Sequence, residues 1–259
     1  MKVHRKPGRV APTAAGERHA AGESAALPAT LGEAAYQRLR ADIVVGAFKA
    51  GEPLRLEALR QRYGLSFSPL REALMRLQSE RLVAATALRG FSVAPLSREE
   101  IEDATETRIL IESEALRRSM RNGDDDWEAD IVAAFHALSL QVERQSKTPG
   151  SVETADLFAM EERHHHFHRA LIAQCRSRRL LELAERLYVE TQRYRLPNYF
   201  GGVLGQRRRD ATTEHREIMD ATLRRSDEAV RLLAEHYRKT AKIIEASIEW
   251  PATSDKAAK

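Results

Sequence analysis

The sequence predicts a mainly α-helical protein, with a small mixed module near the N-terminus and an all-helical bundle behind it. Apolar residues recur at helical spacing from Leu31 onward. The period falls to two only around Phe91 and Val93, where Arg89-Gly90 supplies the turn of a small hairpin. No convincing strand follows residue 95. The prediction is therefore three short helices and a hairpin, followed by about six or seven helices.

Composition limits the class of protein. A chain of 259 residues suggests one large domain or two smaller ones. The net charge is only +4, so local clusters of basic residues matter more than the total. The single cysteine, Cys175, rules out an internal disulfide and fits a reducing cytoplasm, where we expect the protein to be. No apolar run approaches the roughly 18 residues of a membrane span, so we expect no membrane partner.

Four segments can be distinguished along the chain. Residues 1–30 are rich in Ala, Gly, Pro and charge without apolar periodicity, which predicts a disordered basic arm. Residues 31–95 form the mixed module, residues 96–250 the helical bundle and residues 251–259 a tail. The basic residues of the arm either contact phosphates or only solvate it, and solvation is the preferred interpretation.

The N-terminal module has the pattern of a winged helix-turn-helix. Helices are expected from Leu31 to about Gly46 and over Leu56–Tyr63, and Gly64 ends the second one. Ser68 is the expected N-cap of the third helix, with Pro69 at its first position. A first helix, then two short helices joined by a tight turn at Gly64, then a hairpin together predict this fold.

Such a module can bind double-stranded DNA, because a helix fits the major groove and its first turn meets phosphates and base edges. Arg71 lies in that turn and can fork onto a guanine edge or a phosphate. Ser66 and Ser68 can donate hydrogen bonds to phosphates. The alternative is a three-helix packing module that contacts other proteins.

The stretches Tyr63-Gly64-Leu65-Ser66, Ser68-Pro69-Leu70-Arg71-Glu72-Ala73-Leu74 and Arg89-Gly90-Phe91 resemble the GntR family of bacterial repressors. The resemblance implies DNA binding, with wing residue Gly90 at the DNA by close backbone approach. Phe67 stands where that family usually carries an arginine, which puts the operator sequence in doubt. The expected DNA-contacting residues are Ser66, Ser68, Arg71, Arg89 and Gly90.

The bundle begins where Ser97 and Glu100 form a capping box. Breaks are expected at Thr148-Pro149-Gly150 and at Pro197 through Gly202. Beyond the first long helix, further helices are expected at about 127–146, 153–175, 178–196, 207–225 and 227–249.

Four histidines are candidate metal ligands. His164 and His168 are four residues apart, so they share one face of a helix. His215 and His236 lie on two other predicted helices, and a bundle can bring all four into its core. The alternative is a histidine-rich polar surface.

Phe167-His168, Glu214-His215-x-x-Ile218 and His236 resemble the FCD domain of one GntR subfamily. That domain typically binds a metal through one Asp and three His, which implies His164, His168, His215 and His236 as ligands here. His164 stands at the Asp position, so the site would be all-histidine. Loss of the carboxylate favours zinc first, and nickel second, over manganese.

The expected effector is a small carboxylate. Arg108 and Glu112 match an Arg-x-x-x-Glu pattern of the FCD domain, and a buried arginine needs an anionic partner. That partner is either the effector or Glu112 itself. Tyr188, Arg193, Tyr194 and Arg195 are further pocket candidates, with helix packing as their alternative role. The segment from Tyr188 to Arg195 looks most like the carbon-starvation branch, whose effector is a small dicarboxylate.

These observations predict a homodimeric repressor that binds a pseudo-palindromic operator under the control of a carboxylate bound beside a metal. No catalytic residues are expected. The alternative from another class is a metal-dependent hydrolase or oxygenase fused to a DNA-binding module, for which Glu214 beside His215 is the candidate base. A purely structural metal is the third possibility.

Overall fold

A computed structural model describes residues 30–147, 154–200, 210–248 and 250, and side chains are described for these except 154 and 197–200. Over this part of the chain there are nine helices and one two-stranded antiparallel sheet, which confirms the mainly α-helical prediction. None of these helices is both long and apolar enough to cross a membrane. The expected arm and tail lie outside the described residues.

The N-terminal module follows the expected order. Helix α1 spans Leu31–Val44, α2 spans Leu56–Tyr63 and α3 spans Phe67–Ser79. The strands β1 (Val83–Thr86) and β2 (Gly90–Val93) pair antiparallel as the wing. Apolar side chains of α1 and α3 interlock to form the core of the module, with the buried residues Leu39, Leu70, Leu74 and Leu77 among them.

Helix α3 begins earlier than expected. Its N-cap is Ser66 rather than Ser68, so Pro69 is the third helical residue instead of the first. The first turn of a helix has no intrahelical acceptors for its N–H groups, so a proline without an N–H fits there as well. The correction brings Phe67 and Ser68 onto the helix itself.

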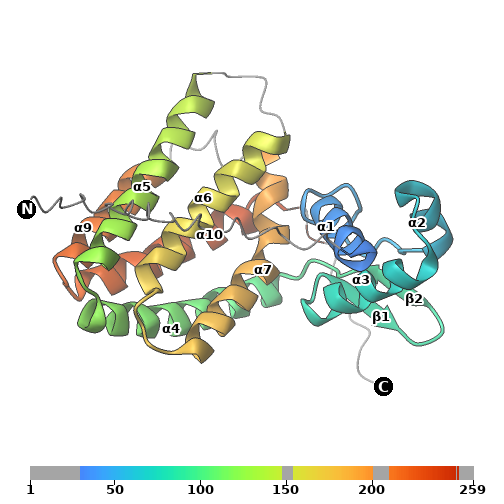
Figure 1. The fold of residues 1–259 in the computed structure, drawn as a ribbon, viewed down its shortest axis with the longest axis horizontal. Helices are drawn as coiled ribbons and strands as arrows, with labels where there is room; N and C mark the ends of the chain where they lie inside the picture. The colour runs from blue at the N-terminus through green and yellow to red at the C-terminus, as the bar shows by residue number, and fades with distance from the viewer. Residues whose placement is uncertain (1–29, 148–153, 201–209, 249, 251–259) are drawn as a thin grey trace, which may run out of the picture.

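The C-terminal bundle starts as predicted, because the Ser97 side chain accepts a hydrogen bond from the Glu100 backbone N–H at 3.2 Å. Asp124 caps the second bundle helix in the same way, at 3.0 Å from the Trp127 N–H. Figure 1 shows these helices gathered on one side of the molecule and the N-terminal module on the other. The bundle consists of α4 (Arg98–Asn122), α5 (Asp125–Ser146), α6 (Thr154–Ile172), α7 (Arg178–Phe200), α9 (Ala211–Leu223) and α10 (Glu228–Glu245).

Helix α7 does not break at Pro197 as expected but continues to Phe200. A proline removes the hydrogen bond that its own nitrogen would donate, and tertiary packing can offset that loss. Leu196, one residue earlier, is 1% exposed and packs into the core of the N-terminal module. Helix α7 therefore belongs to the bundle and also contacts the N-terminal module.

Arg193 of α7 holds the connection between the two halves. Its guanidinium donates to the backbone carbonyls of Ala94 and Pro95, at 3.0 and 2.9 Å. It also donates to the Glu100 carboxylate at 3.0 Å and to the Tyr194 hydroxyl at 3.1 Å. The linker is thus fixed to α7 by a buried cation.

We predict that Leu74→Ala lowers the free energy of unfolding by about 2–5 kcal/mol, because it leaves a cavity in the core of the N-terminal module. Leu74 is fully buried, whereas its neighbour Met75 is 60% exposed. Met75→Ala should therefore change stability by no more than about 0.5 kcal/mol. Urea unfolding of both variants measures the difference. Equal effects would contradict the packing described for α3.

Candidate metal centre and DNA-binding face

All five residues expected at the DNA lie on the surface of the N-terminal module. Ser66, Ser68 and Arg71 are exposed around the start of α3, and Arg89 and Gly90 are exposed at the wing. Gly90 has a φ of +81°, a backbone conformation that residues with a Cβ rarely adopt. The start of α3 and the wing therefore form an exposed polar surface.

Phe67 is the first residue of α3, and its ring is 46% exposed. The guanidinium of Arg60 from α2 lies 5.9 Å from the centre of that ring. Arg60 is itself held by Glu57 at 2.7 Å. Arg60 of α2 therefore places a cation close to the position where the family usually has an arginine.

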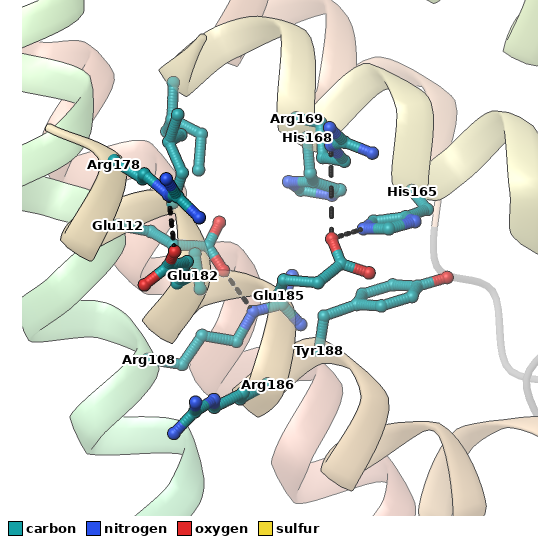
Figure 2. A pocket seen from close by; sticks show the side chains of 13 residues that line it. Arg108, Glu112, His165, His168, Arg169, Arg178, Glu182, Glu185, Arg186 and Tyr188 are labelled. Atoms are coloured by element: carbon teal, nitrogen blue, oxygen red, sulfur yellow. Dashed lines mark hydrogen bonds and ion pairs between the residues drawn. The ribbon is translucent and has the colours of Figure 1, made fainter. Parts of the chain in front are cut away.

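A pocket of about 540 Å³ opens against α4, α6 and α7 (Figure 2). Arg108 on its wall pairs with Glu112, with 2.5 Å between Arg108 Nε and Glu112 Oε1, and both side chains are buried. Burial opposes the charge of Arg108, but Glu112, Tyr237 and Tyr188 together outweigh burial and raise the pKa of the guanidinium above its ordinary value. Glu112 is thus an anionic partner of Arg108, and Arg108 also lines the pocket. The complete lining is Arg108, Glu112, His165, His168, Arg169, Ile172, Arg178, Leu181, Glu182, Ala184, Glu185, Arg186 and Tyr188.

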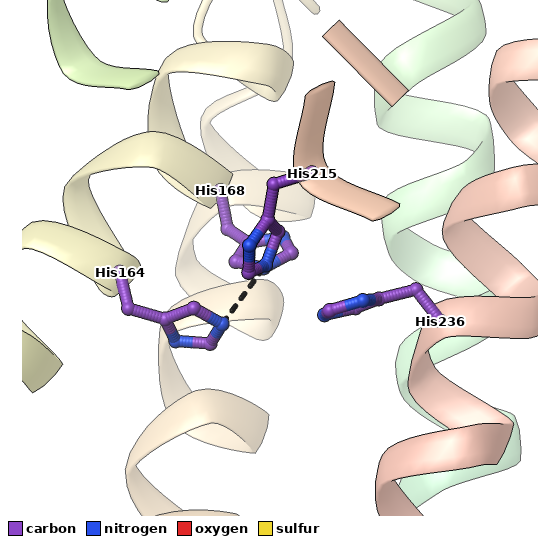
Figure 3. A group of neighbouring side chains, drawn as sticks. All are labelled: His164, His168, His215 and His236. Carbon is purple, nitrogen blue, oxygen red and sulfur yellow. Dashed lines mark hydrogen bonds between the residues drawn. The ribbon is translucent and has the colours of Figure 1, made fainter. Parts of the chain in front are cut away.

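The four predicted histidines come together in the bundle core (Figure 3). His164 and His168 project from α6, His215 from α9 and His236 from α10. All four are buried, and one ligand nitrogen from each lies within 4.8 Å of the others. A single ion with Zn–N bonds of about 2.0–2.1 Å holds its ligand nitrogens roughly 3.3–4.2 Å apart. Small side-chain movements would bring these four into that range.

Neighbouring side chains orient two of the rings. The Tyr237 hydroxyl donates its proton to Glu112 at 2.5 Å, so it accepts from His168 Nδ1 at 3.0 Å. His236 Nδ1 lies 3.0 Å from a Glu214 carboxylate oxygen and donates to it. With the proton on Nδ1, each ring has its Nε2 lone pair available for a metal.

The electrostatics keep His164 and His168 uncharged. Burial lowers the pKa of His164 and of His168 well below the ordinary value of 6.5, and neighbouring histidines and arginines add to the effect. Neutral imidazole is the form that binds zinc, nickel, copper or iron. The donor set and its protonation state therefore fit a transition metal ion.

Arg195 also reaches this region, whereas Tyr194 does not. Arg195 is buried, and with His164 and His236 it lines a second cavity of about 30 Å³. Tyr188 lines the 540 Å³ pocket. Tyr194 lies at the linker with Arg193, where its hydroxyl is 3.3 Å from Glu100, and it is absent from the lining of both cavities.

The sequence reasoning missed Glu161 and Tyr237. Glu161 is 3% exposed, and its Oε2 lies 3.9 Å from His164 Nδ1. It precedes His164 by three residues, a helical spacing that could have identified it. Tyr237 follows His236 directly, and only the three-dimensional packing brings its hydroxyl to His168.

Comparison with known proteins agrees with both halves of the chain. Residues 31–93 match the family model of bacterial regulatory proteins, gntR family, and residues 103–239 match the FCD domain. The chain belongs to the GntR family and carries an FCD domain. It is therefore a transcriptional regulator, and the alternative of an enzyme fused to a DNA-binding module is not supported, because these families and the relatives below are regulators.

Relatives and solved structures extend this similarity. The HTH-type transcriptional regulator BphR of Paraburkholderia xenovorans is 38% identical over 82% of this chain and 84% of its own length. The transcriptional repressor GlaR of Escherichia coli is 38% identical over 62% of this chain and 70% of its own length. The structure of E. coli McbR/YncC is similar in fold, with a TM-score of 0.66 at 20% identity, covering 84% of this chain and 98% of that one.

We predict that the metal-free protein loses stability as the pH falls below about 6.5. His164 and His168 have lowered pKa values when folded, so below pH 6.5 the unfolded chain binds more protons than the folded one. The stability is thus present above pH 6.5, and each histidine can remove up to about 1.4 kcal/mol per pH unit below it.

Urea unfolding of the chelator-treated protein between pH 7.5 and pH 5 tests this. The exposed His166 on the same helix provides the control, since His166→Ala should leave the pH dependence unchanged. The opposite result, stability that increases on acidification, would mean that the buried histidines are already charged.

Proposed function

We propose that this regulator is a homodimeric repressor whose operator binding depends on a metal held by His164, His168, His215 and His236 and on a carboxylate effector. The observation that carries the proposal is the convergence of four buried histidines on one point. Two orienting hydrogen bonds, to Tyr237 and Glu214, further support a metal role. Glu214 then serves to orient a ligand, which is a different task from that of a catalytic base.

Zinc is the proposed metal and nickel the second candidate, because four neutral imidazoles suit borderline ions and offer no carboxylate to manganese. The bound metal would supply a Lewis-acidic point of attachment for a carboxylate oxygen. The surrounding residues would orient the effector and provide positive charge.

The 540 Å³ pocket is the proposed effector site. His168 and Arg108 line its inner wall, so a carboxylate there can approach the metal centre and a guanidinium together. The smaller cavity beside Arg195 has a volume of only about 30 Å³, enough for one or two water molecules. Arg178 and Arg169 of the lining already face Glu182 and Glu185, at 2.7 and 4.0 Å. Arg186 of the same lining is therefore the proposed partner of a second carboxylate, that is, of a dicarboxylate effector.

The operator is proposed to be a pseudo-palindromic duplex. A two-fold dimer presents two copies of α3 about one helical turn of DNA apart, roughly 34 Å. Arg71 would read a base edge, Ser66 and Ser68 would contact phosphates, and the wing would approach through Arg89 and Gly90.

Arg71→Ala should weaken binding to a duplex selected by the native protein by about 10- to 100-fold, equivalent to about 1–3 kcal/mol. Fluorescence anisotropy at fixed salt measures this. Arg117 is an exposed arginine of α4 outside the proposed interface, so Arg117→Ala is the matched control. Native-like specific binding by the Arg71 variant would contradict its proposed role.

His168→Ala should reduce the zinc content of the purified protein and abolish the stabilisation by added dicarboxylates. The removal of one of four imidazoles weakens the coordination, and the same ring lines the effector pocket. Elemental analysis and thermal melting with succinate or related acids measure both effects. His166→Ala is the control, and unchanged zinc stoichiometry in the His168 variant would exclude His168 as a ligand.

A further inference from the structure

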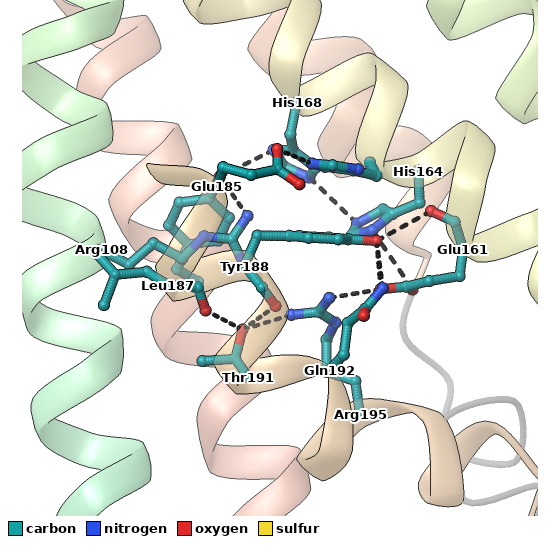
Figure 4. A network of polar contacts seen from close by, with 12 residues as sticks. Arg108, Glu161, His164, His168, Glu185, Leu187, Tyr188, Thr191, Gln192 and Arg195 are labelled. Atoms are coloured by element: carbon teal, nitrogen blue, oxygen red, sulfur yellow. Dashed lines mark hydrogen bonds and ion pairs between the residues drawn. The ribbon is translucent and has the colours of Figure 1, made fainter. Parts of the chain in front are cut away.

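Glu161 connects the histidine cluster to a buried polar network between α6 and α7 (Figure 4). Its Oε1 accepts hydrogen bonds from the Tyr188 hydroxyl at 2.7 Å and from Arg195 at 2.5 Å. Its Oε2 faces His164 Nδ1 at 3.9 Å, and both of these buried atoms have no hydrogen-bond partner within the described residues. His164 Nε2 lies 3.1 Å from His168 Nε2 and donates to it, because the proton of His168 is on Nδ1. A shift of the His164 proton to Nδ1, which leaves Nε2 free for a metal, makes Nδ1 complementary to Glu161 Oε2, and the two atoms are then slightly too far apart to bond.

This pair places a carboxylate beside the ring of His164, as Glu214 does for His236. His164 occupies the position of an expected carboxylate ligand, and Glu161 brings a carboxylate to the other side of the same ring. A hydrogen bond from Nδ1–H to Glu161 would direct His164 Nε2 to the metal, as Tyr237 and Glu214 do for His168 and His236. Its formation requires Glu161 and His164 to approach each other by less than 1 Å, from 3.9 Å to about 3 Å.

The network continues from Glu161 to the N-terminal module. The Gln192 amide nitrogen donates to the Tyr188 hydroxyl at 3.1 Å, and its amide oxygen accepts from the Arg40 guanidinium of α1. Because a guanidinium only donates, the amide of Gln192 is held in this one orientation. Arg40 Nε in turn lies 4.0 Å from the carboxylate of Glu80, the C-cap residue of α3. A series of polar contacts therefore runs from His164 to the C-terminal end of α3.

We propose that Glu161 positions His164 for metal binding, and that Tyr188 and Gln192 transmit the resulting shift to Arg40 and to the end of α3. The proposal rests on metal binding by the four histidines. Movement of His164 toward the other three rings would bring Glu161 after Nδ1 and would change the contacts of Glu161 with Tyr188 and Arg195. The amide of Gln192 and the guanidinium of Arg40 then readjust. The metal acts on the N-terminal module only through its different affinity for the two arrangements.

A second contact across the same junction offers a control. Arg81 lies 3.3 Å from Glu190, which is two residues before Gln192 on α7. The Arg81 side chain is 76% exposed, and the described contacts of this pair do not include the Glu161 network. A loss of the Arg81–Glu190 contact should therefore leave the transmission intact.

The test is hydrogen–deuterium exchange of the α1 amides in chelator-treated full-length protein, with and without added Zn²⁺. In the native protein and in Glu190→Gln, Zn²⁺ should change the exchange of α1 by about fivefold or more, the lower end of typical coupling energies. In Gln192→Leu the change should disappear while zinc affinity stays native. Tyr188→Phe removes only a hydroxyl and interrupts the same route, so it serves as the second variant if Gln192→Leu folds poorly.

Glu161→Gln tests the positioning role through zinc affinity alone. Competition with a chromophoric chelator should show binding weakened by about 10- to 100-fold, as for other residues that orient metal ligands. Native zinc affinity in this variant, or a Zn²⁺ response of α1 that persists in both Gln192→Leu and Tyr188→Phe, would overturn the inference. If the native protein binds zinc but α1 does not respond, only the inference fails. If the native protein binds no zinc, the proposed function fails with it.

Discussion

The stability of the C-terminal bundle depends on how the charge of a group of basic side chains is compensated in its core. Four imidazoles and the guanidinium groups of Arg108 and Arg195 lie buried near one another. Buried charge is costly unless it is paired, and the protein meets this constraint in two ways. The arginines are neutralised by Glu112 and Glu161, while His164 and His168 remain uncharged because burial lowers their pKa values.

The same pairing has a consequence for ligand recognition. Arg108 and Arg195 are each already paired with a glutamate carboxylate of the same chain. An acid that enters the site therefore has to compete with a carboxylate that is already bound there. A carboxylate effector bound as proposed would either share the Arg108 guanidinium with Glu112 or displace Glu112 from it. Under the proposed function, the bundle would distinguish between acids by how well they compete with a glutamate of the chain itself, and a metal held by the four histidines would add a second attraction.

Much of the fold could be predicted from local patterns. The apolar spacing in α1 and α3, the caps at Ser97 and Asp124 and the left-handed Gly64 are determined by neighbouring residues, so the sequence reveals them. The four histidines were also predictable, since helical spacing and the resemblance to the FCD domain pointed to the same set.

The remaining features depend on contacts between distant segments. Helix α7 continues past Pro197 in a region where its neighbour Leu196 packs on another part of the chain. Tyr194 was expected at the effector, but its hydroxyl bonds with Glu100, more than ninety residues away in sequence. Tyr188 and Arg195, which donate to Glu161, are on α7, so the residue spacing within α6 does not predict these contacts.

Helix α7 packs both within the bundle and against the N-terminal module, so the two halves of this regulator cannot be exchanged independently between proteins. Its buried Leu196 completes the core of the N-terminal module, and Arg193 clamps the backbone of the linker. In a chimera that joins the first 95 residues to another regulator's bundle, the helix corresponding to α7 would carry side chains that fit the N-terminal module of that other regulator. Recombination between family members would therefore preserve folding best when the contacting turn of α7 is exchanged together with the DNA-binding segment.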